Sequence, residues 1–276
     1  MSVDNFKPTI WSRELLYSLK KNLVARQITN TNYQGEITSE GDTVRIQSPD
    51  AINVGDYDGS DIDFQGLTSA TQSLLIDRAK YFAFLVDDVD QAQSNVPLMQ
   101  SYMVEASFSL ADELDTHLFS LYTDADADNV IDKEALTASN IYAKMVEAKK
   151  RLSAANVPQM GRWTVLSPDE IALLEQSDEF ISASDLGDQV KQTGIVGRIA
   201  GFQVFESNNV AEANDGTDDV RHLPFGHSIA WTLAEQIVST EAGRREKGFS
   251  DFVKGLHVYG TKVVRPKALG VIEAIV

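Results

Sequence analysis

The residues most able to do chemistry lie between positions 123 and 135, in the sequence TDADADNVIDKEA. Four acids have the spacing of the first, third, fifth and ninth ligands of an EF-hand calcium loop: Asp124, Asp126, Asp128 and Asp132. The twelfth position is Ala135, whereas an EF-hand needs a bidentate glutamate there, and Glu134 comes one residue early. We therefore expect no metal site, and keep calcium binding by these four acids as the weaker alternative.

No enzyme motif accompanies this loop. The chain contains no H-E-x-x-H, P-loop or G-x-S-x-G pattern. The spacing of Gly194, Gly197 and Gly201 does not match a dinucleotide site, so we expect turns and close backbone packing there. With no cysteine in 276 residues, disulfides, thiolate metal sites and cysteine nucleophiles are excluded. The sequence therefore predicts neither an enzyme nor a cofactor.

Charge is distributed unevenly along the chain, whose formal net charge is −17. Residues 1–26 carry five bases against two acids, and residues 244–267 carry seven bases against two acids. The strongly acidic middle argues against the broad basic face of a DNA-reading protein. Basic ends could meet acidic surfaces of other copies, although an acidic chain can also simply be soluble. No apolar run is long enough to cross a membrane.

The first third of the chain contains segments that cannot fold alone. Residues 5–29 predict a short helix followed by an arm, with a helical stripe of Trp11, Leu15, Leu16 and Leu19. Residues 43–76 predict a long hairpin with a polar tip at 55–61. Because a lone two-stranded ribbon is marginally stable in water, this hairpin needs another surface to lie on.

The remaining pattern predicts a mixed α and β body. We expect a buried strand at 74–87, a helix at about 97–122 that is roughly 40 Å long, and a second helix. The apolar stripe of that second helix is Ile141, Met145, Ala148 and Leu152. A strand at 162–166 precedes a helix start at Ser167, and two strands around a turn close the chain.

In this order the segments resemble the major capsid proteins of tailed bacteriophages. NTNYQGEITSEGDTVRI, at 30–46, is similar to the entry into that family's extended loop, and GIVGRIAGFQV, at 194–204, is like its G-x-x-G-x-x-x-G-F-x-V signature. The resemblance implies an α+β phage major-capsid fold in four parts. These are an N-terminal arm (1–30), an extended β-hairpin loop (31–76), a peripheral domain with a β-sheet and a spine helix (77–126 and 237–276), and an inserted axial domain (127–236).

The resemblance also implies a function. The chain would be a structural major capsid protein that self-assembles through pentamers and hexamers into an icosahedral shell enclosing phage double-stranded DNA. It would assemble in the bacterial cytoplasm and remain in the virion. Implied partners are its own copies, a separate scaffolding protein, a portal, an optional decoration protein and non-specifically packaged DNA. The alternatives are an encapsulin-like nanocompartment shell and a calcium-binding surface protein.

The arm and the extended loop are the segments expected to touch other subunits. Extended strands lying on a neighbour add main-chain hydrogen bonds and bury apolar side chains, and closed rings require heterologous contacts. The residues expected to make these contacts are Trp11, Arg13, Lys20, Lys21 and Arg26 in the arm and Ile52, Val54, Tyr57, Ile62 and Phe64 in the loop. We expect Gly194, Gly197 and Gly201 to shape a turn of the axial domain.

Overall fold

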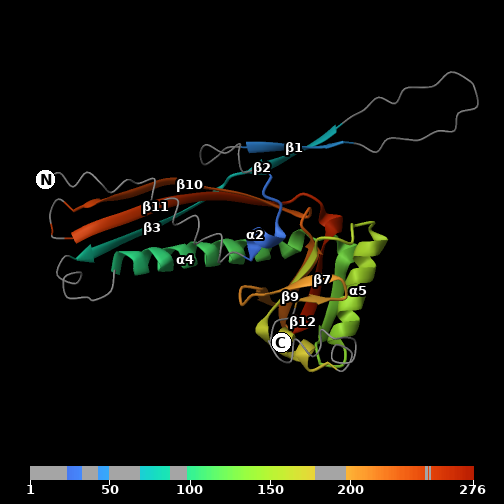
Figure 1. Ribbon diagram of the computed structural model, residues 1–276. Coiled ribbons are helices and arrows are strands. Elements are labelled where there is room, and N and C mark those ends of the chain that lie inside the picture. The colour runs from blue at the N-terminus through green and yellow to red at the C-terminus, as the bar shows by residue number, and fades with distance from the viewer. Residues whose placement is uncertain are drawn as a thin grey trace, which may run out of the picture.

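The computed structural model describes residues 24–32, 43–49, 69–87, 98–177, 197–245, 248 and 250–276. Figure 1 shows an elongated body in which the long helix α4 (Leu98–Ser120) lies beneath a three-stranded sheet. A second lobe, built on a larger sheet and on helix α5 (Ile141–Ala154), lies at the C-terminal end of α4. A two-stranded ribbon lies on the other side of the three-stranded sheet from α4.

Helix α4 packs one face against the three-stranded sheet, which consists of β3 (Arg78–Asp87), β10 (Trp231–Arg244) and β11 (Ser250–Val263) in the antiparallel order β10-β11-β3. Met103, Leu110, Leu114 and Leu118 are buried in this contact, and their spacing of four or seven residues places them on one face of the helix. The helix has 23 residues and is therefore about 35 Å long.

The prediction of one buried strand at 74–87 is wrong. The chain leaves strand geometry at Ile76 and Asp77, so that β2 (Ser69–Leu75) and β3 belong to different sheets. β3 is an edge strand, and beyond Ala79, which packs against the core beneath the ribbon, it is covered on one face only. Phe82 and Phe84 pack toward the larger core, whereas Tyr81 is 79% and Leu85 is 54% exposed. The apolar residues of this strand face both ways, and period-two alternation alone could not show that one face lacks a partner.

The predicted hairpin is present at its base. β1 (Thr43–Pro49) pairs antiparallel with β2, from Thr43 opposite Leu75 to Pro49 opposite Ser69. The ribbon packs on the sheet face opposite α4 in a small core of its own. The buried residues of this core are Val44, Ile46, Leu74, Ile76, Ala234, Val258 and Val264. As expected, the ribbon depends on the sheet, because three of these seven side chains come from β10, β11 and the residue after β11.

The second lobe is a seven-stranded mixed sheet in the order β4-β12-β9-β5-β7-β6, with β8 paired to β9. Its strands are β4 (Val130–Ala135), β5 (Arg162–Leu166), β6 (Arg198–Ile199), β7 (Phe202–Glu206), β8 (Ala211–Asn214), β9 (Asp219–His227) and β12 (Leu269–Ile275). The four apolar residues predicted for the second helix are all buried in α5. Helix α6 (Pro168–Glu175) starts at Ser167 with a capping box to Glu170, as predicted.

The sheets divide the chain differently from the predicted boundary at 236/237. β10 starts at Trp231 and already belongs to the three-stranded sheet. β12 follows the short turn η4 (Pro266–Ala268) and returns to the larger sheet, between β4 and β9. Residues 269–275 therefore pair in the larger sheet, although they fall within the predicted peripheral domain, and the four-part division of the chain stays a prediction. The hydrophobic pattern of a segment can identify it as a strand. Which strand it pairs with depends on contacts between residues that are far apart in the sequence.

We predict that Gly260→Ala detaches the ribbon from the sheet. A Cβ at this β11 position would lie 2.3 Å from the backbone oxygen of Leu75, so the ribbon and the sheet would have to separate. We expect the free energy of unfolding in urea to fall by about 1–3 kcal/mol, the usual cost of overpacking. The control is Gly197→Ala, where a Cβ meets nothing within 4 Å, and a change within about 0.5 kcal/mol is expected. Equal effects of the two substitutions would contradict this account.

Candidate functional site

The root of the predicted arm is fixed to the body by backbone pairing. Helix α2 (Ala25–Ile28) lies against α4, and both Ala25 and Ile28 are fully buried. Asn30 then forms a parallel bridge with β10: its N–H donates to the oxygen of Trp231 at 2.8 Å, and its oxygen accepts from the N–H of Leu233 at 3.0 Å. This short segment therefore anchors whatever precedes it in the chain.

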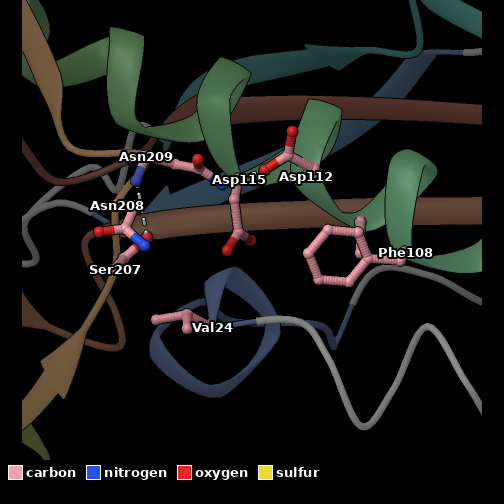
Figure 2. Close-up of a pocket in the computed structure, with 8 residues that line it drawn as sticks. Val24, Phe108, Asp112, Asp115, Ser207, Asn208 and Asn209 are labelled. Carbon is pink, nitrogen blue, oxygen red and sulfur yellow. Dashed lines mark hydrogen bonds between the residues drawn. The ribbon is translucent and has the colours of Figure 1, made fainter.

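A buried carboxylate holds the start of α2. Asp115 of α4 is only 4% exposed, and its Oδ1 accepts a hydrogen bond from the backbone N–H of Ala25 at 3.1 Å. Figure 2 shows this side chain between α4 and the loop that carries Val24. Burial raises the pKa of Asp115 to about 7, and hydrogen bonds from the backbone of Ala25 and Val24 oppose that rise.

A charged pair holds the same segment to the sheet. The guanidinium of Arg26 donates to the carboxylate of Glu235, which is buried on β10. His257 of β11 is also buried, and its Nε2 lies 3.4 Å from the other oxygen of Glu235. Arg26 was predicted to touch another subunit, and the structure shows it paired within its own chain.

The other predicted inter-subunit residues lie outside the described residues: Trp11, Arg13, Lys20, Lys21, Ile52, Val54, Tyr57, Ile62 and Phe64. What the structure describes is where the two segments that carry them attach. The arm attaches through α2 at α4 and β10, and the loop attaches through β1 and β2 on the opposite face of the sheet. The contacts themselves stay predictions.

The aspartate-rich loop links α4 to the second lobe as two 3₁₀ turns followed by a strand. The turns are η2 (Leu121–Asp124) and η3 (Ala127–Asn129), and β4 begins at once. Asn129 points inward, and its Nδ2 donates to the backbone oxygens of Lys267 and Leu269 at 2.9 and 3.1 Å. Arg151 of α5 donates to the backbone oxygens of Asp128 and Val130. The loop is thus tied to the end of the chain and to α5.

The four acids of the possible calcium loop do not converge. Asp126 accepts from the backbone N–H of Asp128 at 3.1 Å, whereas Asp132 lies exposed on β4. Within the described ranges, no group of three or more acidic or histidine side chains is placed to hold a metal ion. Sequence reasoning missed β4 because Ile131 is its only fully buried residue.

The glycines of the predicted turn differ in role. Gly201 adopts φ +90° and Ala200 adopts φ +48°, in the tight connection between β6 and β7. A side chain at Gly201 would be strained in this left-handed conformation. Gly197 has open space around it, and Gly194 lies outside the described residues.

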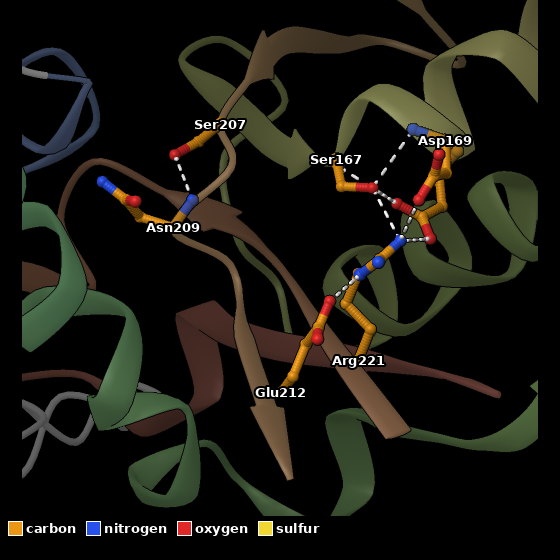
Figure 3. A network of polar contacts seen from close by, with 7 residues as sticks. Ser167, Asp169, Ser207, Asn209, Glu212 and Arg221 are labelled. Atoms are coloured by element: carbon orange, nitrogen blue, oxygen red, sulfur yellow. Dashed lines mark hydrogen bonds and ion pairs between the residues drawn. The ribbon is translucent and has the colours of Figure 1, made fainter. Parts of the chain in front are cut away.

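Arg221 of β9 organises a polar cluster that sequence reasoning did not identify (Figure 3). Its Nη1 donates to Ser167 at 2.8 Å and to Glu170 at 2.7 Å, both at the start of α6, and its Nε donates to Glu212 of β8 at 2.6 Å. Because these donors and acceptors satisfy one another within the chain, the cluster ties α6 to β8 and β9 and needs no ligand.

We predict a pH-dependent stability that Asp115→Asn removes. The folded-state pKa of Asp115 lies above the ordinary value of 3.8, so its contribution to the unfolding free energy is complete below about pH 4 and is lost as the pH rises toward about 7. Asparagine keeps the acceptor without the charge. At about pH 8 we expect the variant to be more stable than the parent by about 1–3 kcal/mol in urea, and at about pH 4 we expect no difference. Glu105→Gln, at an exposed position of α4, is the control; a pH-independent difference for Asp115→Asn would contradict the prediction.

A second prediction separates a structural joint from a calcium loop. Asn129→Ala removes both hydrogen bonds to the end of the chain and should lower the unfolding free energy by about 1–3 kcal/mol. Asp128→Ala, at an exposed side chain, should change it by less than about 0.5 kcal/mol. Millimolar calcium should leave the melting temperature unchanged. A calcium-dependent increase that Asp124→Ala abolishes would restore the calcium-loop interpretation.

Comparisons with known proteins address identity. The family model described as Phage capsid protein matches residues 71–272, while no curated protein sequence matches the chain. A solved chain of Mycobacterium phage Che8 is 29% identical with a TM-score of 0.74, over 91% of this chain and 90% of that one.

Two further solved structures share the fold at lower identity. The capsid of Ralstonia phage GP4 has a TM-score of 0.69 at 12% identity, over 90% of this chain and 86% of that one. The capsid of cyanophage P-SCSP1u has a TM-score of 0.64 at 17% identity, over 98% and 99%. Among the described helices, none is long and apolar enough to cross a bilayer. The chain belongs to the phage capsid protein family and has the fold of the tailed-phage major capsid proteins.

Proposed function

We propose that this structural protein forms an icosahedral shell through pentamers and hexamers, and that the shell encloses phage double-stranded DNA. The observation that carries the proposal is the way the ribbon is attached. β1 and β2 are held by buried side chains on the face of the three-stranded sheet opposite α4, and residues 50–68 connect them in the sequence. A long connection between two strands that are themselves packed on the sheet is suited to contact a neighbouring subunit.

Exposed apolar side chains support assembly. Tyr81 and Leu85 lie on the uncovered face of β3, and Tyr102, Val104 and Phe108 are about half exposed on α4. Apolar patches of this kind mark surfaces that another protein covers. Because these residues and the ribbon lie on different parts of the molecule, contacts between them in neighbouring copies would be heterologous, as closed rings require.

The charge of the chain supports enclosure of DNA without tight binding. A net charge of −17 argues against the broad basic face expected of a protein that binds DNA tightly. A separate scaffolding protein, a portal, a decoration protein and assembly in the bacterial cytoplasm are further proposals, and they rest on the family resemblance. An encapsulin-like compartment would use the same fold, and nuclease-resistant DNA in particles purified from infected cells would distinguish a phage shell from it.

Electron microscopy of purified protein tests the proposal directly. We expect rings or closed shells, formed by the protein alone or after scaffolding protein is added. A compact monomer at every protein concentration, with and without scaffolding protein, would overturn it.

The predicted loop contacts can be tested by substitution. Tyr57→Ser combined with Phe64→Ser removes two apolar side chains of the extended loop and should reduce the yield of assembled particles at least tenfold. Both residues lie in the segment proposed to contact a neighbouring subunit, so we expect the melting temperature of the monomer to stay the same. Ser60→Ala, in the same loop, should assemble normally. Normal assembly of the double variant would remove these residues from the interface.

A further inference from the structure

One flank of α4 is covered along half of its length only. Five residues at steps of three or four lie on this flank: Val104, Phe108, Ala111, Asp115 and Phe119. The last three are buried, and α2 lies against α4 where the N–H of Ala25 donates to Asp115. Val104 and Phe108 continue the same line toward the start of α4 but are 52% and 54% exposed. The flank is therefore an apolar surface whose partner ends at α2.

The chain that precedes α2 begins beside this uncovered stretch. Val24 lines the same cavity as Phe108 and Ala111, together with Asp112 and Asp115 (Figure 2). The backbone from Ala25 to Asn30 is fixed by Asp115 and by β10, so the point from which residues 1–23 depart is also fixed. The cavity is also lined by Ser207, Asn208 and Asn209, and Asn209 donates a hydrogen bond to Asp112 at 2.6 Å.

The sequence that departs from this point matches the surface in pattern and in charge. Residues 5–21 carry the helical stripe of Trp11, Leu15, Leu16 and Leu19. Residues 1–23 contain four bases and two acids, whereas α4 contains four acids and no lysine or arginine. A helix over 5–21 would be about 25 Å long, comparable with the roughly 20 Å of α4 between Leu98 and Ala111.

We propose that residues 5–21 dock, in the unassembled subunit, along the flank of α4 formed by Val104 and Phe108 of the same chain. The apolar stripe covers these two side chains, and the basic residues lie near Glu105 and Asp112. This goes beyond the proposed shell function, because it concerns a contact within one chain before assembly. It has one consequence for assembly: while docked, Trp11 and its neighbours are unavailable to another subunit, so the arm competes with its own shell contacts.

The absence of cysteine makes the contact measurable with single reporters. Val104→Cys places a thiol on the flank while leaving Phe108 in place, and Ser109→Cys places one on the exposed opposite side of α4 as the matched control. Each is labelled with a small maleimide at a concentration where sedimentation shows monomer. The labelling rate of each cysteine variant is measured with the native arm and with an arm that carries Leu15→Ser, Leu16→Ser and Leu19→Ser. Circular dichroism checks that all four proteins are folded.

We expect the thiol of Val104→Cys to react roughly tenfold more slowly with the native arm than with the variant arm, and that of Ser109→Cys to react equally in both. A second variant, Lys20→Glu with Lys21→Glu, should give an intermediate rate, because it keeps the stripe and reverses the charge. The slow rate should persist on tenfold dilution. Equal rates for Val104→Cys in both arms would overturn the proposal. Protection that disappears on dilution would also overturn it, and would assign the flank to the arm of a second copy. Neither result bears on shell formation, which is scored separately by microscopy.

Discussion

The structure depends on the packing of Trp231 where its two lobes meet. Its ring is fully buried, is stacked on Trp163 of the second sheet with centroids 5.0 Å apart, and lies 6.4 Å from the ring of Phe119 at the end of α4. Aromatic pairs of this kind combine a large buried area with a preferred geometry. Its backbone oxygen also accepts the hydrogen bond from Asn30 that anchors the arm. One residue at the start of β10 thus joins the long helix, both sheets and the arm root.

The packing around Trp231 lies next to the three-stranded sheet, to which both extended segments of the chain are attached. The three-stranded sheet is packed on both faces, by α4 on one and by the ribbon on the other, so the two extended segments attach to opposite sides of one rigid layer. Gly260 lets the ribbon approach the sheet closely, and Asp115 with Glu235 holds the arm root on the other side. A shell subunit needs both extended segments that contact neighbouring subunits and a closely packed core to which those segments are attached.

The polar groups at these anchors are costly as well as useful. Asp115 and Glu235 are buried carboxylates, and burying a charge is favourable only when hydrogen bonds and partners compensate for lost hydration. Burial raises the pKa of Asp115 to about 7, and the hydrogen bonds from backbone N–H groups offset only part of that rise. Glu235 is compensated differently, because the guanidinium of Arg26 donates to its carboxylate. The arm root is therefore held in part by a contact at Asp115 that responds to protonation, whereas the core beneath the ribbon is apolar.

Much of the local structure could be predicted from the sequence, because it depends on neighbours within a few residues. The stripes of α4 and α5, the capping box at Ser167 and the base of the ribbon followed from spacing alone. The aspartate loop illustrates the limit. Its spacing suggested a calcium site, and the displaced Glu134 argued against one, but nothing in the local sequence indicated that Asn129 turns inward to the carbonyls of Lys267 and Leu269. The sequence by itself determined the two long helices, the start of α6 and the base of the ribbon. Only the tertiary structure decided that β12 joins the larger sheet, that β3 has a bare face and that Arg26 finds its partner in Glu235, because each of these depends on residues that are distant in the chain and meet only when it folds.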